Sequence, residues 1–264
     1  MKTFISPGSW FCFEYPDSWY EFEGREDGFL FYDPDNWTGN FYVQAWRDVR
    51  KDYGRQCVED EAKNVGARLA TVEAWDVAKS EESFVEEGLA YTNHYWLVGF
   101  ENTCVECTFT VPKGKPCDLG ERMVASLKIN RLDAFFPPSL IPVRLAEMTE
   151  IDNACSQLEH IAKRAFKAQF KNFRQSVELL QRLIGENELA QFGTDANVLL
   201  GLTTCALIAE NVEGYEWRTY INKEEEKPVL VKDGRICADP CVFFTQPLAS
   251  IDIFDSIDTM LSSD

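Results

Sequence analysis

The stretch WFCFEYPDSWYEFE, residues 10–23, decides the fold of the first half of this chain. It opens with an aromatic-rich run, Trp10 to Tyr15, and then reaches Pro16-Asp17-Ser18, a common turn signal. Residues 19–23 have the period of a β-strand, with Trp19, Glu21 and Glu23 on one face and Tyr20 and Phe22 on the other. The stretch therefore predicts two extended segments joined by a short turn.

The sequence that follows repeats this strand-and-turn pattern. Aromatic runs at residues 29–32 and 41–46 are bounded by Gly, Pro and Asp, which is typical of antiparallel strands. Further strand patterns lie at residues 84–86, 89–91, 94–98 and 104–109. A closing helix is expected after Pro116. Residues 1–131 are thus predicted to form one domain, an antiparallel sheet with packed helices.

One more helix is expected between these strands. Its apolar residues recur at steps of four and three, and they are Val58, Ala62, Val65, Leu69 and Val72. That spacing places all five on one face of a helix over residues 58–72.

A proline-rich segment separates this domain from the rest of the chain. Pro137, Pro138 and Pro142 disfavour both helix interiors and sheet ladders, so residues 132–142 are predicted to be a linker. The second domain is expected over residues 143–264. The predicted fold class is α+β for both domains.

The second domain is expected to begin with a long amphipathic helix. Apolar residues recur at helical spacing through residues 145–184, and Gly185 marks the end. The other expected elements are a helix over residues 194–211, strands at 215–221, 229–231 and 235–244 that form a small antiparallel meander, and a short helix from Pro247.

Three motifs of the first half resemble the PsbP-like fold, which includes PsbP proteins and Mog-type Ran-binding proteins. They are YPDSW (Tyr15 to Trp19), FYDPDN (Phe31 to Asn36) and the closing MVASLKI (Met123 to Ile129). The resemblance implies an α/β/α sandwich. The second half, with GYEWRTY at residues 214–220, resembles an uncharacterised bacterial domain that follows such modules. Together the two resemblances imply a two-domain bacterial protein of unknown function, and no binding residue of either named family maps onto this chain.

The charge of the chain limits its partners. With 26 basic and 44 acidic residues, its formal net charge is −18. Such a chain repels nucleic-acid backbones and anionic lipid surfaces, so neither nucleic acid nor a membrane is expected as a partner. It attracts a basic protein partner, and one narrow version is an inhibitor of a basic toxin. The alternative is that the charge only keeps the protein soluble.

Two observations favour a cytoplasmic protein. The first residues contain no signal-peptide core, and no apolar run approaches the ~18–20 residues of a membrane helix. The nine cysteines are an odd number, which is typical of reduced thiols in the cytosol.

Cys104-x-x-Cys107 has the spacing of zinc and redox sites, but its flanks read as a strand. Residues three apart in a strand face opposite sides, so the two sulfurs cannot share an ion. Cys237 and Cys241 lack a second ligand pair nearby. No metal site and no cofactor site is therefore expected.

No catalytic motif is present in the sequence. It contains neither G-x-S-x-G nor a glycine-rich phosphate loop, and it offers only His94 and His160 as histidine bases. No catalytic residue is therefore expected. The alternative that stays open is a cysteine-dependent hydrolase or thiol enzyme that uses one of these histidines.

The favoured hypothesis is a non-catalytic binding or protein-interaction protein with an acidic, aromatic-rich surface. Two sets of residues are candidates for an interaction surface. The aromatic set is Trp10, Trp19, Trp37 and Trp46, and the basic set is the helical stripe Lys163, Lys167, Lys171 and Arg174. The stripe is a local reversal of charge in an acidic chain, and it also suits a plain solvated helix face.

Overall fold

The computed structural model describes residues 1–24, 27–64 and 66–262, and the chain divides into two compact units, Met1–Pro137 and Pro138–Asp264. Both units combine helices with antiparallel sheets, so the predicted α+β class is confirmed. Among the described residues, no helix combines the length and the apolar character needed to cross a membrane.

Unit 1 is built around a seven-stranded antiparallel sheet of order β3-β4-β5-β9-β8-β7-β6. Most of its strands follow directly from the aromatic and alternating patterns of the sequence. The strands are β3 (Tyr20–Glu23), β4 (Phe29–Tyr32), β5 (Asn40–Arg47), β6 (Arg68–Val72), β7 (Trp75–Glu86), β8 (Leu89–Phe100) and β9 (Thr103–Pro112).

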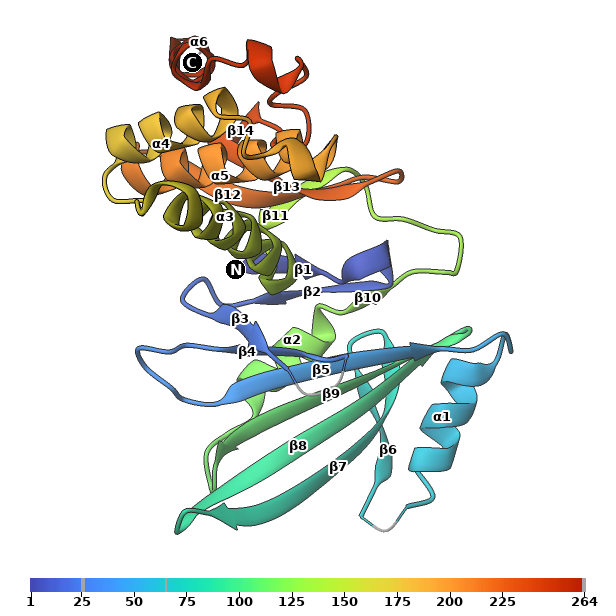
Figure 1. Cartoon of the computed structure of the whole chain (residues 1–264). Helices are drawn as coiled ribbons and strands as arrows, with labels where there is room; N and C mark the ends of the chain where they lie inside the picture. Colours follow the sequence, from blue (N-terminus) through green and yellow to red (C-terminus); the bar gives the residue numbers. More distant parts are fainter. Residues whose placement is uncertain (25–26, 65, 263–264) are drawn as a thin grey trace. The chain divides into compact units, whose positions relative to one another are not determined.

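One face of this sheet carries the core of unit 1. A three-stranded sheet and helix α2 (Asp118–Ala125) lie against it, as Figure 1 shows. The smaller sheet has the order β1-β2-β10 and consists of β1 (Lys2–Ile5), β2 (Phe11–Tyr15) and β10 (Lys128–Ile129). Rings from both sheets meet at centroid distances of 5.1 to 5.3 Å, as in the pairs Phe4–Phe31, Phe13–Phe31 and Phe13–Phe41.

Helix α1 (Tyr53–Glu61) packs on the opposite face, at the end of the sheet where β8 turns into β9. The contact is close because two glycines meet there. A Cβ atom built on Gly99 would lie 2.0 Å from the carbonyl oxygen of Gly54. Only glycine therefore lets the helix approach the strand this closely.

The predicted helix over residues 58–72 is wrong beyond Glu61, and among the described residues only 58–61 are helical. Helix α1 ends at Glu61, and β6 begins at Arg68 to pair with β7. Leu69 is 63% exposed, so its helical spacing from Val58 was coincidental. Gly66 has a φ of +89°, so residues 58–72 cannot form one continuous helix. Val65, another residue of the expected stripe, lies outside the described residues.

Unit 2 packs helices on a four-stranded antiparallel meander of order β11-β12-β13-β14. Its strands are β11 (Ser139–Pro142), β12 (Tyr215–Ile221), β13 (Glu226–Lys232) and β14 (Arg235–Ala238). Its helices are α3 (Leu145–Phe166), α4 (Phe173–Gly185), α5 (Asp195–Asn211) and α6 (Ile253–Ser262). Short 3-10 helices also occur at Pro7–Ser9 in unit 1 and at Ala190–Phe192 and Leu248–Ser250 in unit 2.

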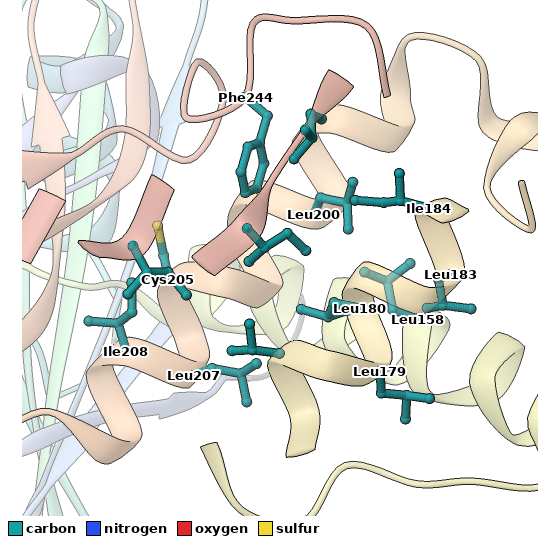
Figure 2. Packing of buried hydrophobic residues seen from close by; sticks show 14 of the residues in the cluster. Leu158, Leu179, Leu180, Leu183, Ile184, Leu200, Cys205, Leu207, Ile208 and Phe244 are labelled. Atoms are coloured by element: carbon teal, nitrogen blue, oxygen red, sulfur yellow. The ribbon is translucent and has the colours of Figure 1, made fainter. Parts of the chain in front are cut away.

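Helix α5 is the central element of unit 2. Ten of its residues are buried, among them Leu200, Cys205 and Ile208. These three belong to the same cluster of buried side chains as Leu158 of α3 and Leu180 of α4, and Figure 2 labels all five. A helix that is apolar all round is one that its neighbours surround, which explains why α5 lacks a polar face.

The single long helix expected over residues 145–184 is two helices. Helix α3 ends at Phe166, because Lys167 adopts a left-handed conformation with φ +56° and ψ +30°. Helix α4 starts after Asn172, whose side chain accepts a hydrogen bond from the backbone N–H of Gln175. The apolar spacing continues across the break, since Phe166, Phe170 and Phe173 all pack against the same core.

The end of the expected linker is part of unit 2. Residues 139–142 form β11, which pairs with β12, although proline occupies the last position. The compact units therefore meet at residues 137 and 138. The strand expected to reach residue 244 stops at Ala238, where Asp239-Pro240 follows. The helix expected to start at Pro247 consists of the 3-10 turn at Leu248–Ser250 and the separate helix α6.

Candidate binding surface

The outward face of the seven-stranded sheet, turned away from α2 and the small sheet, is the candidate site. The register of the strands shows which residues lie on this face. Phe41, Val43, Cys107 and Phe109 belong to the core, so their strand neighbours point outward. Tyr42, Thr108 and Tyr95 are thus cross-strand partners in one outward row. We call this surface the aromatic face.

Eight aromatic side chains occupy outward positions on the aromatic face. Strands β3, β4 and β5 contribute Tyr20, Phe22, Tyr32, Tyr42 and Trp46, and β7 and β8 contribute Phe84, Tyr91 and Tyr95. Helix α1 covers only the end near Gly99. All eight remain exposed or half-exposed. In a core they would be buried, so they form a broad apolar surface that is accessible in the isolated unit.

Ring contacts hold several of these side chains in place. Phe22 and Tyr32 stack with their centroids 3.8 Å apart, and Phe84 and Tyr91 stack at 5.5 Å. Trp37, from the loop between β4 and β5, meets Tyr91 edge to face at 5.9 Å. Rings ordered in this way lose little conformational entropy when a partner binds.

Polar groups lie between the rings and are linked by hydrogen bonds. Thr110 donates to Asn93 Oδ1 at 2.7 Å, and the Asn93 amide donates to the Tyr95 hydroxyl at 2.9 Å. The Tyr42 hydroxyl donates to Gln44 Oε1 at 2.9 Å. The aromatic face therefore combines apolar area with fixed donors and acceptors, the composition of a binding surface.

The charge on the aromatic face has one sign. Its strands place Asp76, Glu82, Glu86 and Glu106 at outward positions, and none of their outward positions holds Lys or Arg. Burial raises the pKa of the Glu106 carboxyl, and the carboxylate of Glu61 on α1 raises it further. Such a surface attracts cations both through its carboxylates and through the faces of its rings.

A cation already lies against the edge of the aromatic face. The Lys2 ammonium is 4.3 Å from the ring centroid of Tyr20, and it also donates to the backbone carbonyl of Trp19 at 3.0 Å. The contact is a cation–π pair within the chain itself.

The four candidate tryptophans differ in their environments. Trp46 is an outward residue of the aromatic face, Trp37 packs on its Tyr91, and each is 40% exposed. Trp10 is half-buried, with the Arg47 guanidinium 4.6 Å from its ring centroid. Trp19 is 3% exposed and belongs to the core, so its place in a surface set is corrected.

All four residues of the basic stripe are exposed. Three of them, Lys163, Lys167 and Lys171, line a groove of about 750 Å³ between the end of α3 and α4. Arg174 is paired with Glu178 at 3.1 Å. Because the helix breaks at Lys167, the four basic residues do not form one straight helical stripe. Three of them line a groove instead.

The cysteines of the C-x-x-C motif have different neighbours. Cys107 belongs to the core cluster of unit 1, whereas Cys104 lies beside Cys57 of α1 on the other face. Burial raises the pKa of both thiols. Across the described part of the chain, no group of three or more His, Cys, Asp and Glu side chains is arranged to hold a metal ion.

The two histidines are in contrasting places. His160 is exposed on α3. His94 is 9% exposed on β8, and neither of its ring nitrogens has a hydrogen-bond partner among the described residues. No cysteine of the described chain is therefore hydrogen-bonded to His94, the contact that thiol activation requires.

The sequence-based prediction missed most of the aromatic face, including Tyr42, Tyr91 and Tyr95. The strand patterns at residues 89–91 and 94–98 were visible, but they do not say which of the two faces of the sheet is covered. Only the three-dimensional placement of α1, α2 and the small sheet distinguishes them.

Comparisons with known proteins agree on a family but name no activity. The model of the family described as "Domain of unknown function (DUF3805)" matches residues 1–152, and that of "Domain of unknown function (DUF3806)" matches residues 176–250. A crystal structure of a protein from Bacteroides thetaiotaomicron VPI-5482 is 36% identical, covers 100% of this chain and 99% of its own, and has a TM-score of 0.92. No curated protein matches.

Two more distant structures cover about half of this chain. Cyanobacterial PsbP (CyanoP) from Synechocystis sp. PCC 6803 is 12% identical over 49% of this chain and 92% of its own, with a TM-score of 0.26. LpqN, involved in cell envelope biogenesis of Mycobacterium tuberculosis, is 10% identical over 46% of this chain and 83% of its own, with a TM-score of 0.30. Likenesses at these scores support no argument about function.

Proposed function

This chain belongs to the DUF3805 family, a domain of unknown function, and we propose that it is a binding protein that holds a basic segment of a partner protein on its aromatic face. The observation that carries the proposal is the composition of that face. Eight aromatic side chains and four carboxylates share it, and no Lys or Arg stands at its outward strand positions.

The chemistry of the face favours a basic occupant over an apolar or acidic one. An acidic partner would meet the carboxylates of Glu82 and Glu86 without a cation to neutralise them. A Lys or Arg side chain interacts favourably with both the carboxylates and the aromatic rings of the face. Its charged group can pair with a carboxylate while it lies over a ring. Each such ring contact contributes ~0.5–2 kcal/mol, depending on desolvation.

The rings divide the aromatic face into two regions. One lies around Phe22 and Tyr32 at the β3 edge, and the other around Tyr91, Phe84 and Trp37 near the β7–β8 turn. Between them lie the hydrogen-bonded side chains of Asn93 and Tyr95. We expect an extended segment of the partner to place one basic residue in each region. Between these two residues, the segment should hydrogen-bond with the side chains of Asn93 and Tyr95.

The proposal is tested by titrating a short Arg- and Lys-rich peptide into the protein and measuring heat or tryptophan fluorescence. Two variants remove what the proposal requires, Tyr91→Ala for the ring and Glu82→Lys for the charge. Each should weaken binding by about tenfold, equivalent to ~1.4 kcal/mol.

Matched controls separate this effect from general changes. Phe135→Ala removes an aromatic side chain that is 42% exposed outside the face, and Glu213→Lys reverses an exposed charge in unit 2. Both should bind the peptide as the unmodified protein does. If Glu213→Lys lost as much affinity as Glu82→Lys while Tyr91→Ala lost none, the peptide would bind only through net charge, and the proposal would be wrong.

Three further points belong to the same proposal. We propose that the first 131 residues have a PsbP-like sandwich, since YPDSW and FYDPDN carry that resemblance. The second half is proposed to be the uncharacterised bacterial domain that follows such modules. The compartment we propose is the cytoplasm, because reduced thiols suit an odd number of cysteines.

A further inference from the structure

A second surface, in unit 2, has the opposite charge. The groove between the end of α3 and α4 is lined by Lys163, Lys167, Lys171 and Arg182, with Glu178 as its only carboxylate among the lining residues. Four cations against one anion leave +3 in the groove, within a chain of net charge −18.

The ammonium groups of the three lysines in this groove are not used to hold the fold together. No ion pair joins Lys163, Lys167 or Lys171 to a carboxylate in the described ranges, whereas Arg182 is paired with Glu186 at 2.7 Å. Arg182 also lies 3.9 Å from the ring centroid of Phe166, so its position is fixed. The three ammonium groups therefore remain available to an external anion.

Two of these lysines stand where local stability disfavours them. Lys167 holds a left-handed conformation at the end of α3, a position that glycine usually occupies. Lys171 immediately precedes the N-cap of α4, whose first turn has no acidic residue, and a cation there opposes the helix dipole. The dipole of α3 stabilises a positive charge at Lys163, which lies in the last turn of that helix. It does not explain why a lysine occupies position 171.

We propose that this groove binds a short acidic segment, rich in Asp and Glu, of a partner protein. Charge complementarity selects the occupant, because the screening length of ~8 Å at physiological salt lets nearby lysines act against the negative charge of the whole chain. A long polyanion such as nucleic acid would be repelled more strongly than a short peptide, because it extends beyond the groove toward a chain whose net charge is −18. The groove also lacks a free aromatic platform for bases, since Arg182 covers Phe166.

The test measures binding of a fluorescein-labelled octaglutamate peptide by anisotropy at about 50 mM and about 300 mM salt. We expect binding that weakens at the higher salt. The double variant Lys163→Glu/Lys171→Glu should lower the affinity by tenfold or more, equivalent to at least ~1.4 kcal/mol.

Lys167→Gly separates binding from folding. It removes one charge and supplies the residue that a left-handed helix end prefers, so binding should weaken while the melting temperature stays the same or rises. Lys223→Glu, at an exposed hairpin position away from the groove, is the matched control and should bind as the unmodified protein does.

Three results would overturn the proposal. The first is that octaglutamate does not bind at about 50 mM salt, or that octaglutamine binds as well. The second is that Lys223→Glu loses as much affinity as the groove variants. The third is that a single-stranded oligonucleotide of equal charge displaces the peptide at a lower concentration, which would make nucleic acid the better occupant.

Discussion

At the scale of single residues, His94 has an environment that should make stability depend on pH. It is buried on β8, and its Nδ1 lies 3.6 Å from Glu81 Oε2. Burial lowers its pKa, Lys79 lowers it further, and the carboxylates of Glu81 and Glu121 oppose the shift. Because burial has the largest effect, the folded protein prefers the neutral ring.

The sign of the pH effect follows from this lowered pKa. Unfolded His94 takes up a proton near its ordinary pKa of ~6.5, while the folded ring resists it. The free energy of unfolding should therefore fall as the pH drops below ~6.5, until the folded ring is protonated as well. We predict that the free energy of unfolding of His94→Phe, measured by urea unfolding from about pH 5 to 8, depends less on pH than that of the unmodified protein. The same pH dependence in His94→Phe as in the unmodified protein would contradict the assignment.

At the scale of elements, close backbone contacts determine where helices pack. Helix α1 reaches the sheet only because Gly54 and Gly99 lack side chains. The helix is short and has only two buried residues, Gly54 and Val58. Its position therefore depends on this contact more than on an apolar stripe.

We predict that Gly99→Ala destabilises unit 1. The new methyl group would lie 2.0 Å from the Gly54 carbonyl oxygen, so α1 must shift, at a cost of ~1–3 kcal/mol. Chemical denaturation monitored by circular dichroism measures this change. Gly185→Ala at the end of α4 is the control, since its Cβ would meet no atom within 4 Å, and its stability should not fall. Unchanged stability in Gly99→Ala would show that α1 can move away freely.

The break between α3 and α4 is another feature of this scale. Apolar spacing continues across it, because both helices bury residues in one core. The turn itself depends on Lys167 and on the Asn172 cap, neither of which breaks a helix as strongly as proline or glycine does. The pattern of apolar residues therefore could not distinguish one long helix from two.

At the scale of the whole molecule, the chain consists of two compact units whose boundary does not follow the family models. The DUF3805 match extends to residue 152, inside α3, whereas the units meet at residues 137 and 138. The segment between β10 and β11 exposes Phe135 at 42%. It pairs with no strand, while the following residues are paired in β11.

Limited proteolysis should cut this segment first. Chymotrypsin should cleave after Phe135, and trypsin after the exposed Arg131 rather than after Arg144, which is 3% exposed and paired with Glu147 and Glu226. Mass spectrometry of the fragments should then identify two resistant products. First cuts within β7 or β8 would contradict a boundary at this place.

Local sequence determined the strands around Pro16 and Asp33, the α+β class and the position of α5, because turn residues and apolar periodicity act over a few neighbours. Tertiary structure alone decided which side of each strand is covered. Trp19 is buried and Trp37 is exposed although both follow turn signals, since only the small sheet, α1 and α2 define inside and outside. For the same reason the aromatic face and the lysine groove became visible only in three dimensions. Each brings together residues from separate elements, whose contacts depend on register and on helix ends rather than on spacing along the chain.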